Sequence, residues 1–117
     1  MNKSLLYRLF ALGTVMMCVL DASAAEAYLN YTPSNTTMTF YYDDQKSSRP
    51  GTTYYINQYS VSGFPAWFED GNSGYVTRVV FDSSFAEARP TKTTKWFYGM
   101  RNLQSIIGMN YLDSYSV

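Results

Sequence analysis

The feature that most limits how this chain can fold is a self-similarity between two apolar stretches of its last third. Shifting the sequence by 27 residues superimposes four apolar pairs, and both stretches read apolar-x-x-apolar-apolar. The pairs are Val76 with Leu103, Val79 with Ile106, Val80 with Ile107 and Phe85 with Leu112. The spacing falls within the period of leucine-rich repeats, about 20–29 residues. We therefore interpret residues 75–117 as the start of a leucine-rich-repeat array. The alternative is two strands of a small antiparallel domain that share this spacing by chance.

The first 24 residues have the pattern of a secretory signal peptide. Lys3 and Arg8 give a positive start, Leu9–Leu20 is an apolar run, and small residues follow up to Ala24. The run is shorter than the roughly 20 residues that cross a bilayer, although a buried N-terminal helix is an alternative. We expect cleavage after Ala24, no membrane span afterwards, and a protein that is secreted or held at the cell surface.

The composition of the remaining chain excludes several kinds of chemistry. It has no histidine, and its one cysteine, Cys18, lies in the leader, so histidine-based nucleophile systems and the usual zinc sites are absent. Removing Lys3, Arg8 and Asp21 leaves seven basic and eight acidic residues, which gives no electrostatic case for nucleic acid. Acidic residues 43, 44, 69, 70 and 82 fall at expected turns, where Asp is common for backbone reasons. We therefore expect that the protein is not an enzyme and that it binds neither a cofactor nor a metal.

Residues 25–74 read as a β-rich cap in front of the repeat. Ala27–Tyr31 and Met38–Tyr42 are aromatic runs separated by turn residues, which predicts a hairpin. Further strands are expected at Thr52–Tyr59 and Tyr75–Phe81, and one or two helical turns at Thr93–Met100. The predicted fold class is mainly β: a hairpin-rich N-terminal cap followed by one to two coils of a solenoid.

Aromatic residues are the candidate binding residues. Adjacent tyrosines on a strand point to opposite faces, so one of each pair is expected to be exposed. Exposed Tyr and Trp give large contact areas with a polar tip, which suits protein and sugar recognition. The alternative is that they fill a small core that has no disulfide. The candidates are Tyr41, Tyr54, Tyr55 and Trp67.

Two long segments, TFYYDDQKSSRPG and VTRVVFDSSFAEARPTKTTKWFYGMRNLQSIIGMNYL, carry a family resemblance. Together they resemble the N-terminal region of BspA-like leucine-rich-repeat surface proteins of Bacteroidetes bacteria, over most of residues 39–117. The resemblance implies secretion, cell-surface display, and adhesion or protein–protein contact without catalysis. Family members usually continue with many repeats, so the chain is expected to be a truncated repeat protein. The repeats it lacks hold the family's binding surface, so no binding residues are carried over.

Two functions follow as hypotheses. The first is a surface interaction module that binds a protein or glycan ligand. The second is a small aromatic carbohydrate-binding module whose last residues only mimic a repeat. The last coil is expected to expose Leu103, Ile106 and Leu112, which would favour self-association.

Overall fold

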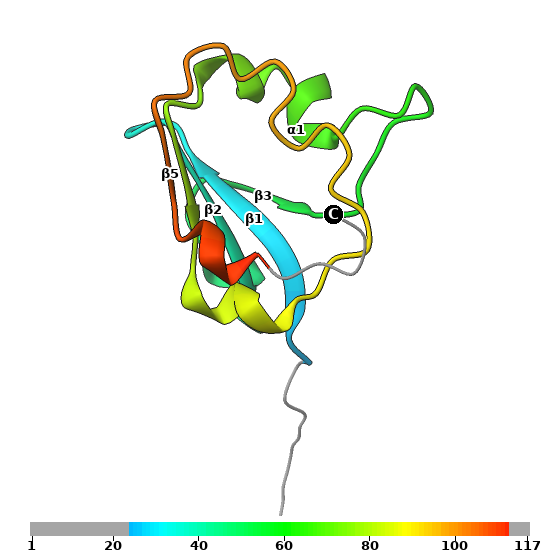
Figure 1. Ribbon diagram of the computed structural model, residues 1–117, viewed down its shortest axis with the longest axis vertical. Helices are drawn as coiled ribbons and strands as arrows, with labels where there is room; N and C mark the ends of the chain where they lie inside the picture. The colour runs from blue at the N-terminus through cyan, green and yellow to red at the C-terminus, as the bar shows by residue number, and fades with distance from the viewer. Residues whose placement is uncertain (1–23, 113–117) are drawn as a thin grey trace, which may run out of the picture.

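The structure, a computed structural model, describes residues 24–112 and is built on one open sheet of five strands (Figure 1). The strand order is β3-β1-β2-β4-β5. Strand β1 pairs antiparallel with β2 and β3, whereas β2, β4 and β5 run parallel. The prediction of a mainly β chain is confirmed. The strands are β1 (Glu26–Thr32), β2 (Thr37–Asp43), β3 (Thr52–Tyr55), β4 (Arg78–Phe81) and β5 (Ser105–Ile107).

Helical structure in the described part of the chain consists of single turns. None of the helices among residues 24–112 has the length and apolar character that crossing a bilayer requires. The turns are η2 (Lys46–Ser48), α1 (Ala66–Glu69), η3 (Asn72–Tyr75), η4 (Ser83–Glu87) and η5 (Met109–Tyr111). The predicted leader falls almost entirely outside the described residues.

The predicted hairpin is present as β1 and β2. Its register pairs Leu29 with Phe40 and Tyr31 with Met38, and all four side chains are buried on the same face of the sheet. Aromatic and branched side chains favour a pleated, half-buried surface, which explains why this segment forms strands. The alternation between buried and more exposed positions along β2 is the one that the sequence indicates.

Two predicted strands are shorter than expected. Strand β3 ends at Tyr55, because the next residues turn and the Gln58 N–H bonds back to the Tyr55 carbonyl at 3.2 Å. Strand β4 begins only at Arg78, because Tyr75 is the last residue of η3 and the chain leaves that turn through Val76 and Thr77. After η3, the first hydrogen bond to the sheet is the one that the Thr77 N–H donates to the Thr36 carbonyl at 3.0 Å.

The Thr93–Met100 segment forms successive turns in place of the predicted helical turns. Positive φ angles at Lys95 (58°) and Gly99 (79°) interrupt any helix. Its Trp96 and Met100 side chains are nevertheless buried in the core. Figure 1 shows this segment, in yellow to orange, passing over the molecule from the η4 end towards β5.

The core is largely aromatic and lies on one face of the sheet. Phe40 is its centre: its ring centroid lies 4.6 Å from that of Phe81, 4.9 Å from Trp96 and 5.5 Å from Phe85. The Trp67 Nε1–H donates to the Trp96 carbonyl at 2.9 Å, which joins α1 to the segment before β5. Strands from residues 25–74 and from residues 75–112 therefore share one sheet and one core.

Strands β4 and β5, each followed by a 3₁₀ turn, form two similar units side by side. The parallel register pairs Val79 with Ile106 and Val80 with Ile107, the 27-residue offset seen in the sequence. The turns η4 and η5 are also in contact. Equivalent positions differ in burial, since Val79 is 0% exposed whereas Ile106 is 36% exposed. Strand β5 is the edge of the sheet, so its core-side residue has a neighbour on one side only.

Candidate functional site

The four aromatic residues chosen from the sequence do not form one site. Tyr54 and Trp67 are buried, so their choice as exposed binding residues is wrong, whereas Tyr55 is exposed, as expected for one tyrosine of the Tyr54-Tyr55 pair. Their rings pack edge to face with centroids 6.0 Å apart. The Tyr54 hydroxyl donates to Asp70 Oδ2 at 2.7 Å and accepts from Asn72 Nδ2 at 2.7 Å. Both residues therefore hold α1 and η3 against the sheet.

Tyr41 and Tyr55 lie on the opposite face of the sheet in a row with Tyr28. The register pairs Tyr28 with both, so the three side chains cross β3, β1 and β2 at one level. We call them the tyrosine row. The Tyr28 and Tyr41 rings stack with centroids 5.5 Å apart. Tyr55 is exposed, Tyr41 is half-buried and Tyr28 is fully buried.

Side chains from the loop after β2 cover this row. The guanidinium of Arg49 lies 3.7 Å from the Tyr41 ring centroid, and Lys46 Nζ lies 4.1 Å from that of Tyr55. Arg49 also donates from Nε to Tyr28 Oη at 3.0 Å and forms an ion pair with Asp43 at 2.7 Å. Each of these contacts stabilises the loop on the sheet. The tyrosine row is therefore better explained as a loop anchor than as an open ligand platform.

The hydroxyl at the centre of this anchor is held in its neutral form. Burial raises the pKa of Tyr28 to about 12; the Arg49 hydrogen bond lowers that pKa, and the bond to Asp43 raises it. Tyr28 Oη donates to Asp43 Oδ1 at 2.6 Å. Burial acts to raise the pKa of Asp43, but hydrogen bonds from Tyr28, the Gln45 N–H and Arg49 hold that pKa below its usual value.

This anchor predicts a loss of stability in alkaline solution. Between pH 10 and 12 the unfolded chain loses the Tyr28 proton while the folded chain keeps it, so the free energy of unfolding should fall as pH rises. The fall due to Tyr28 is on the order of 2 kcal/mol. Urea unfolding at pH 7, 10 and 12 measures it. Tyr28→Phe should be less stable at pH 7 but should show a shallower alkaline decline, whereas Tyr98→Phe, at an exposed position, should keep the wild-type slope. An unchanged slope in Tyr28→Phe would rule this assignment out.

A second aromatic surface lies beside α1 and was missed in the sequence. The rings of Phe64, Phe68 and Tyr98 form a triangle with centroids 4.9–5.2 Å apart. We call it the ring triangle. Tyr98 is 51% exposed, and the two phenylalanines are half-buried. The feature of the sequence that could have indicated this surface is the adjacent pair Trp67 and Phe68. The first residue points into the core and the second contributes to the surface.

Two lysines of the neighbouring segment lie over aromatic rings, Lys95 over a ring of the triangle and Lys92 over Tyr59, which lies outside the triangle. Lys95 Nζ is 5.3 Å from the Phe64 ring centroid, and Lys92 Nζ is 4.0 Å from that of Tyr59. The Tyr59 hydroxyl donates to the Thr94 carbonyl at 2.8 Å, which fixes the lysine-bearing segment against its neighbour. Both lysines are exposed. The ring triangle thus has the Lys95 ammonium group beside the accessible Tyr98 ring, since both contact Phe64, and the Lys92 ammonium group lies three residues before Lys95 on the same segment.

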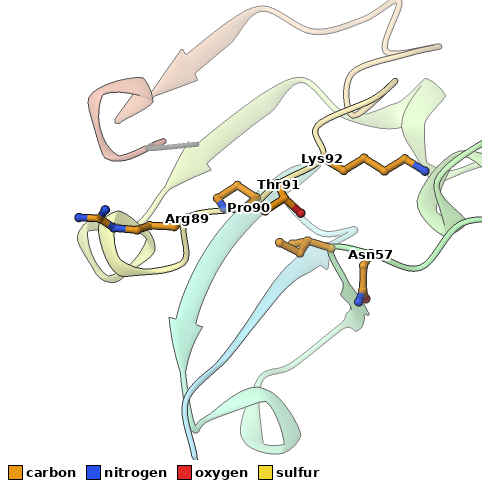
Figure 2. A pocket seen from close by; sticks show the side chains of 6 residues that line it. Asn57, Arg89, Pro90, Thr91 and Lys92 are labelled. Carbon is orange, nitrogen blue, oxygen red and sulfur yellow. The ribbon is translucent and has the colours of Figure 1, made fainter. Parts of the chain in front are cut away.

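A shallow cavity of about 210 Å³ adjoins the same lysine-bearing segment. Figure 2 shows that its lining side chains do not converge, because Arg89 and Lys92 extend in opposite directions. The other labelled residues are Asn57, Pro90 and Thr91. This arrangement lacks the set of converging polar groups that marks a catalytic or cofactor site.

A third candidate surface is the face of β4 and β5 opposite the core. Val80 and Ile107 are paired on this face, on the side away from the buried Val79. Ile107 is exposed and Val80 is half-buried. Arg78 and Ser105, also paired, are both exposed at the other end of the strands. A partner would meet the apolar side chains of Val80 and Ile107 beside the positive charge of Arg78.

Neither a metal site nor a known relative guides the choice among these surfaces. Within residues 24–112 there is no group of three or more His, Cys, Asp or Glu side chains arranged to hold a metal. No family model, curated protein or solved structure matches the chain. The candidate surfaces therefore rest on the geometry of the described residues.

Proposed function

We propose that the chain is an exported, non-enzymatic binding protein in which β4 and β5 open a leucine-rich-repeat solenoid behind a β-hairpin cap. The observation that carries this proposal is the parallel pairing of Val79 with Ile106 at a 27-residue offset. In a solenoid each repeat contacts its neighbours, so equivalent residues of successive coils pair in this way. The contact between η4 and η5 extends the correspondence beyond the strands.

The open edge of β5 supports the same proposal. Ile106 is 36% exposed, whereas Leu103 and Leu112, which were expected to be exposed, are half-buried against the core. Their counterparts Val76, Val79 and Phe85 are each 0% exposed. A further coil would bury Leu103, Ile106 and Leu112, and so would a second copy of the protein. Self-association through β5 is therefore part of the proposal, and sedimentation velocity across a range of protein concentrations measures it.

The proposed activity is adhesion or protein–protein contact outside the cell. Solenoids bind partners on the surface formed by their strands, and here that surface centres on Val80 and Ile107. Residues 25–117, which we call the mature protein, should be immobilised and tested against a panel of cell-surface proteins and glycans. The affinity should fall at least about tenfold in Val80→Glu/Ile107→Glu, which is a loss of about 1.4 kcal/mol of binding free energy. Tyr75→Ser, at another exposed position, is the matched control. The proposal would be contradicted if no member of the panel bound, or if Val80→Glu/Ile107→Glu bound as tightly as the Tyr75→Ser control.

Export can be tested separately through the leader. We propose that residues 1–24 are removed during secretion, because they combine a positive start, an apolar run and small residues before the expected cut. Expression of the full sequence followed by mass spectrometry of the exported protein should give an N-terminus at Ala25. Retention in the cell with Met1 still attached would overturn the export proposal.

The ring triangle favours the second candidate, a small carbohydrate-binding module. An exposed tyrosine supported by two further rings offers a flat apolar surface of the kind on which sugar rings pack. A glycan array with the mature protein separates the two functions. Binding that is lost in Tyr98→Ala but kept in Val80→Glu/Ile107→Glu favours the carbohydrate module.

A further inference from the structure

The segment from Lys92 to Lys95 presents two ammonium groups that the fold holds in place. Each lies over a ring of the neighbouring loop, Lys92 over Tyr59 and Lys95 over Phe64. A lysine held over a ring has lost part of its rotamer freedom before any ligand arrives, so it binds an anion with a smaller entropic cost. The Tyr59 hydroxyl, bonded to the Thr94 carbonyl at 2.8 Å, further limits movement of the segment.

The charges around this segment favour an anionic ligand. Within residues 24–112, the one ion pair joins Arg49 to Asp43 at the loop anchor. Neither Lys92 nor Lys95 therefore forms an ion pair with a carboxylate of these residues. The carboxylate of Glu69 on the neighbouring α1 accepts a hydrogen bond from Ser60 Oγ at 2.7 Å and forms no ion pair with either lysine. Because the mature chain is close to neutral overall, positive charge at this surface is a local property.

The aromatic neighbour of the lysines indicates what carries the anion. The Tyr98 ring packs 5.2 Å from Phe64 and 5.0 Å from Phe68, centroid to centroid, and stays half exposed. Rings that support one another in this way present a fixed apolar face to solvent. A sugar ring can pack on such a face while its carboxylate or sulfate reaches the ammonium groups.

We propose that the surface formed by Lys92, Lys95 and Tyr98 binds an anionic polysaccharide. The Tyr98 ring packs against a sugar ring whose carboxylate or sulfate contacts the Lys95 ammonium, because Lys95 and Tyr98 both contact Phe64, and Lys92 contacts an acidic group further along the polymer. The inference rests on the proposed function in one respect, that the ligand is met outside the cell. It assigns a ligand class to a surface other than the β4–β5 face, so the two can be tested independently.

Affinity electrophoresis of the full mature protein tests this binding. The gels contain polygalacturonate, dextran sulfate or neutral dextran, and the change in mobility with polymer concentration gives the affinity. The wild type should be retarded by one or both anionic polymers and not by dextran. Comparison of polygalacturonate with dextran sulfate shows whether carboxylate or sulfate is preferred. Lys92→Gln/Lys95→Gln should weaken binding at least about tenfold, and Tyr98→Ala about threefold or more.

Two controls separate a built site from a general charge effect. Lys46→Gln also removes a lysine held over a tyrosine, but on the opposite face of the sheet, and it should bind as the wild type does. Polyglutamate, an anionic polymer without sugar rings, should bind more weakly and should not respond to Tyr98→Ala. Equal losses in Lys46→Gln and in the double variant would overturn the proposal, and so would equal, Tyr98-independent binding of polyglutamate or no binding at all. Thermal melting of each variant confirms that it is folded.

Failure of this proposal can be told apart from failure of the proposed function. The lysine variants leave β5 unchanged, so stacking of further coils on β5 should proceed in them as in the wild type. If the wild-type protein binds none of the anionic polysaccharides while further coils still stack on β5, only the ligand assignment fails.

Discussion

Phe40→Ala should abolish stable folding of the mature protein at 25 °C. The Phe40 side chain is fully buried, and it stacks on both Phe81 and Trp96. It therefore joins β2 to β4 and to the segment that precedes β5. Replacing a buried phenylalanine by alanine costs about 3–5 kcal/mol. That loss is comparable to the whole stability of a small domain, about 5 kcal/mol at the lower end of the usual range.

Circular dichroism and urea unfolding measure this loss. Tyr75→Ala is the matched control, because Tyr75 is aromatic but 67% exposed. Its free energy of unfolding should stay within about 0.5 kcal/mol of the wild type, as is usual for surface positions. A cooperative unfolding transition for Phe40→Ala within about 1 kcal/mol of the wild type would show that the core is not organised around this ring.

The second large effect should come from placing aspartate at equivalent positions of the two strand units. Val79 is fully buried, so Val79→Asp leaves a charge without a partner in the core and should unfold the protein. Ile106 is its partner in register but is 36% exposed at the sheet edge. Ile106→Asp should therefore cost only about 1 kcal/mol or less, since its carboxylate reaches water.

The same pair distinguishes a repeat from a simple edge strand. If a second copy of residues 91–117 is joined to the C-terminal end, the 27-residue spacing continues, and Ile106 should become as buried as Val79. Ile106→Asp should then prevent the added unit from stacking, while the rest of the protein remains folded. Urea unfolding of the extended protein and of its Ile106→Asp variant gives the comparison. Equal stability of these two extended proteins would contradict a repeat.

Local patterns in the sequence predicted the hairpin and the pairing of β4 with β5. The hairpin follows from alternation, because Met38 and Phe40 share one face of a strand. The register of β4 and β5 follows from the 27-residue offset, because parallel neighbours place matching apolar residues side by side. Both features depend on spacing along the chain, which a sequence displays directly.

The surface aromatics were harder to predict because their exposure depends on contacts between distant segments. Trp67 is buried because α1 packs on the segment around Trp96, 29 residues later in the chain. Tyr41 is partly covered by Arg49, and no local pattern shows that this arginine folds back over it. The ring triangle combines residues 64 and 68 with residue 98 and becomes visible only in the folded protein.

The central claim is that β4 and β5 are successive coils to which another coil can be added. The Ser105 N–H bonds to the Thr77 carbonyl at 3.3 Å, and alternate residues of a strand direct their N–H groups to opposite edges, so the Ile106 N–H faces the open edge. We predict that this amide exchanges rapidly with solvent deuterium in the mature protein.

Hydrogen exchange of the Ile106 amide, followed by NMR in the mature protein and in the protein extended by residues 91–117, is the most direct test. The repeat account predicts that exchange slows at least about tenfold in the extended protein, because the new parallel strand accepts this hydrogen bond. It also predicts that the free energy of unfolding rises by about 2 kcal/mol or more as apolar residues of β5 are buried. An Ile106 amide that exchanges equally fast in both proteins would contradict the account.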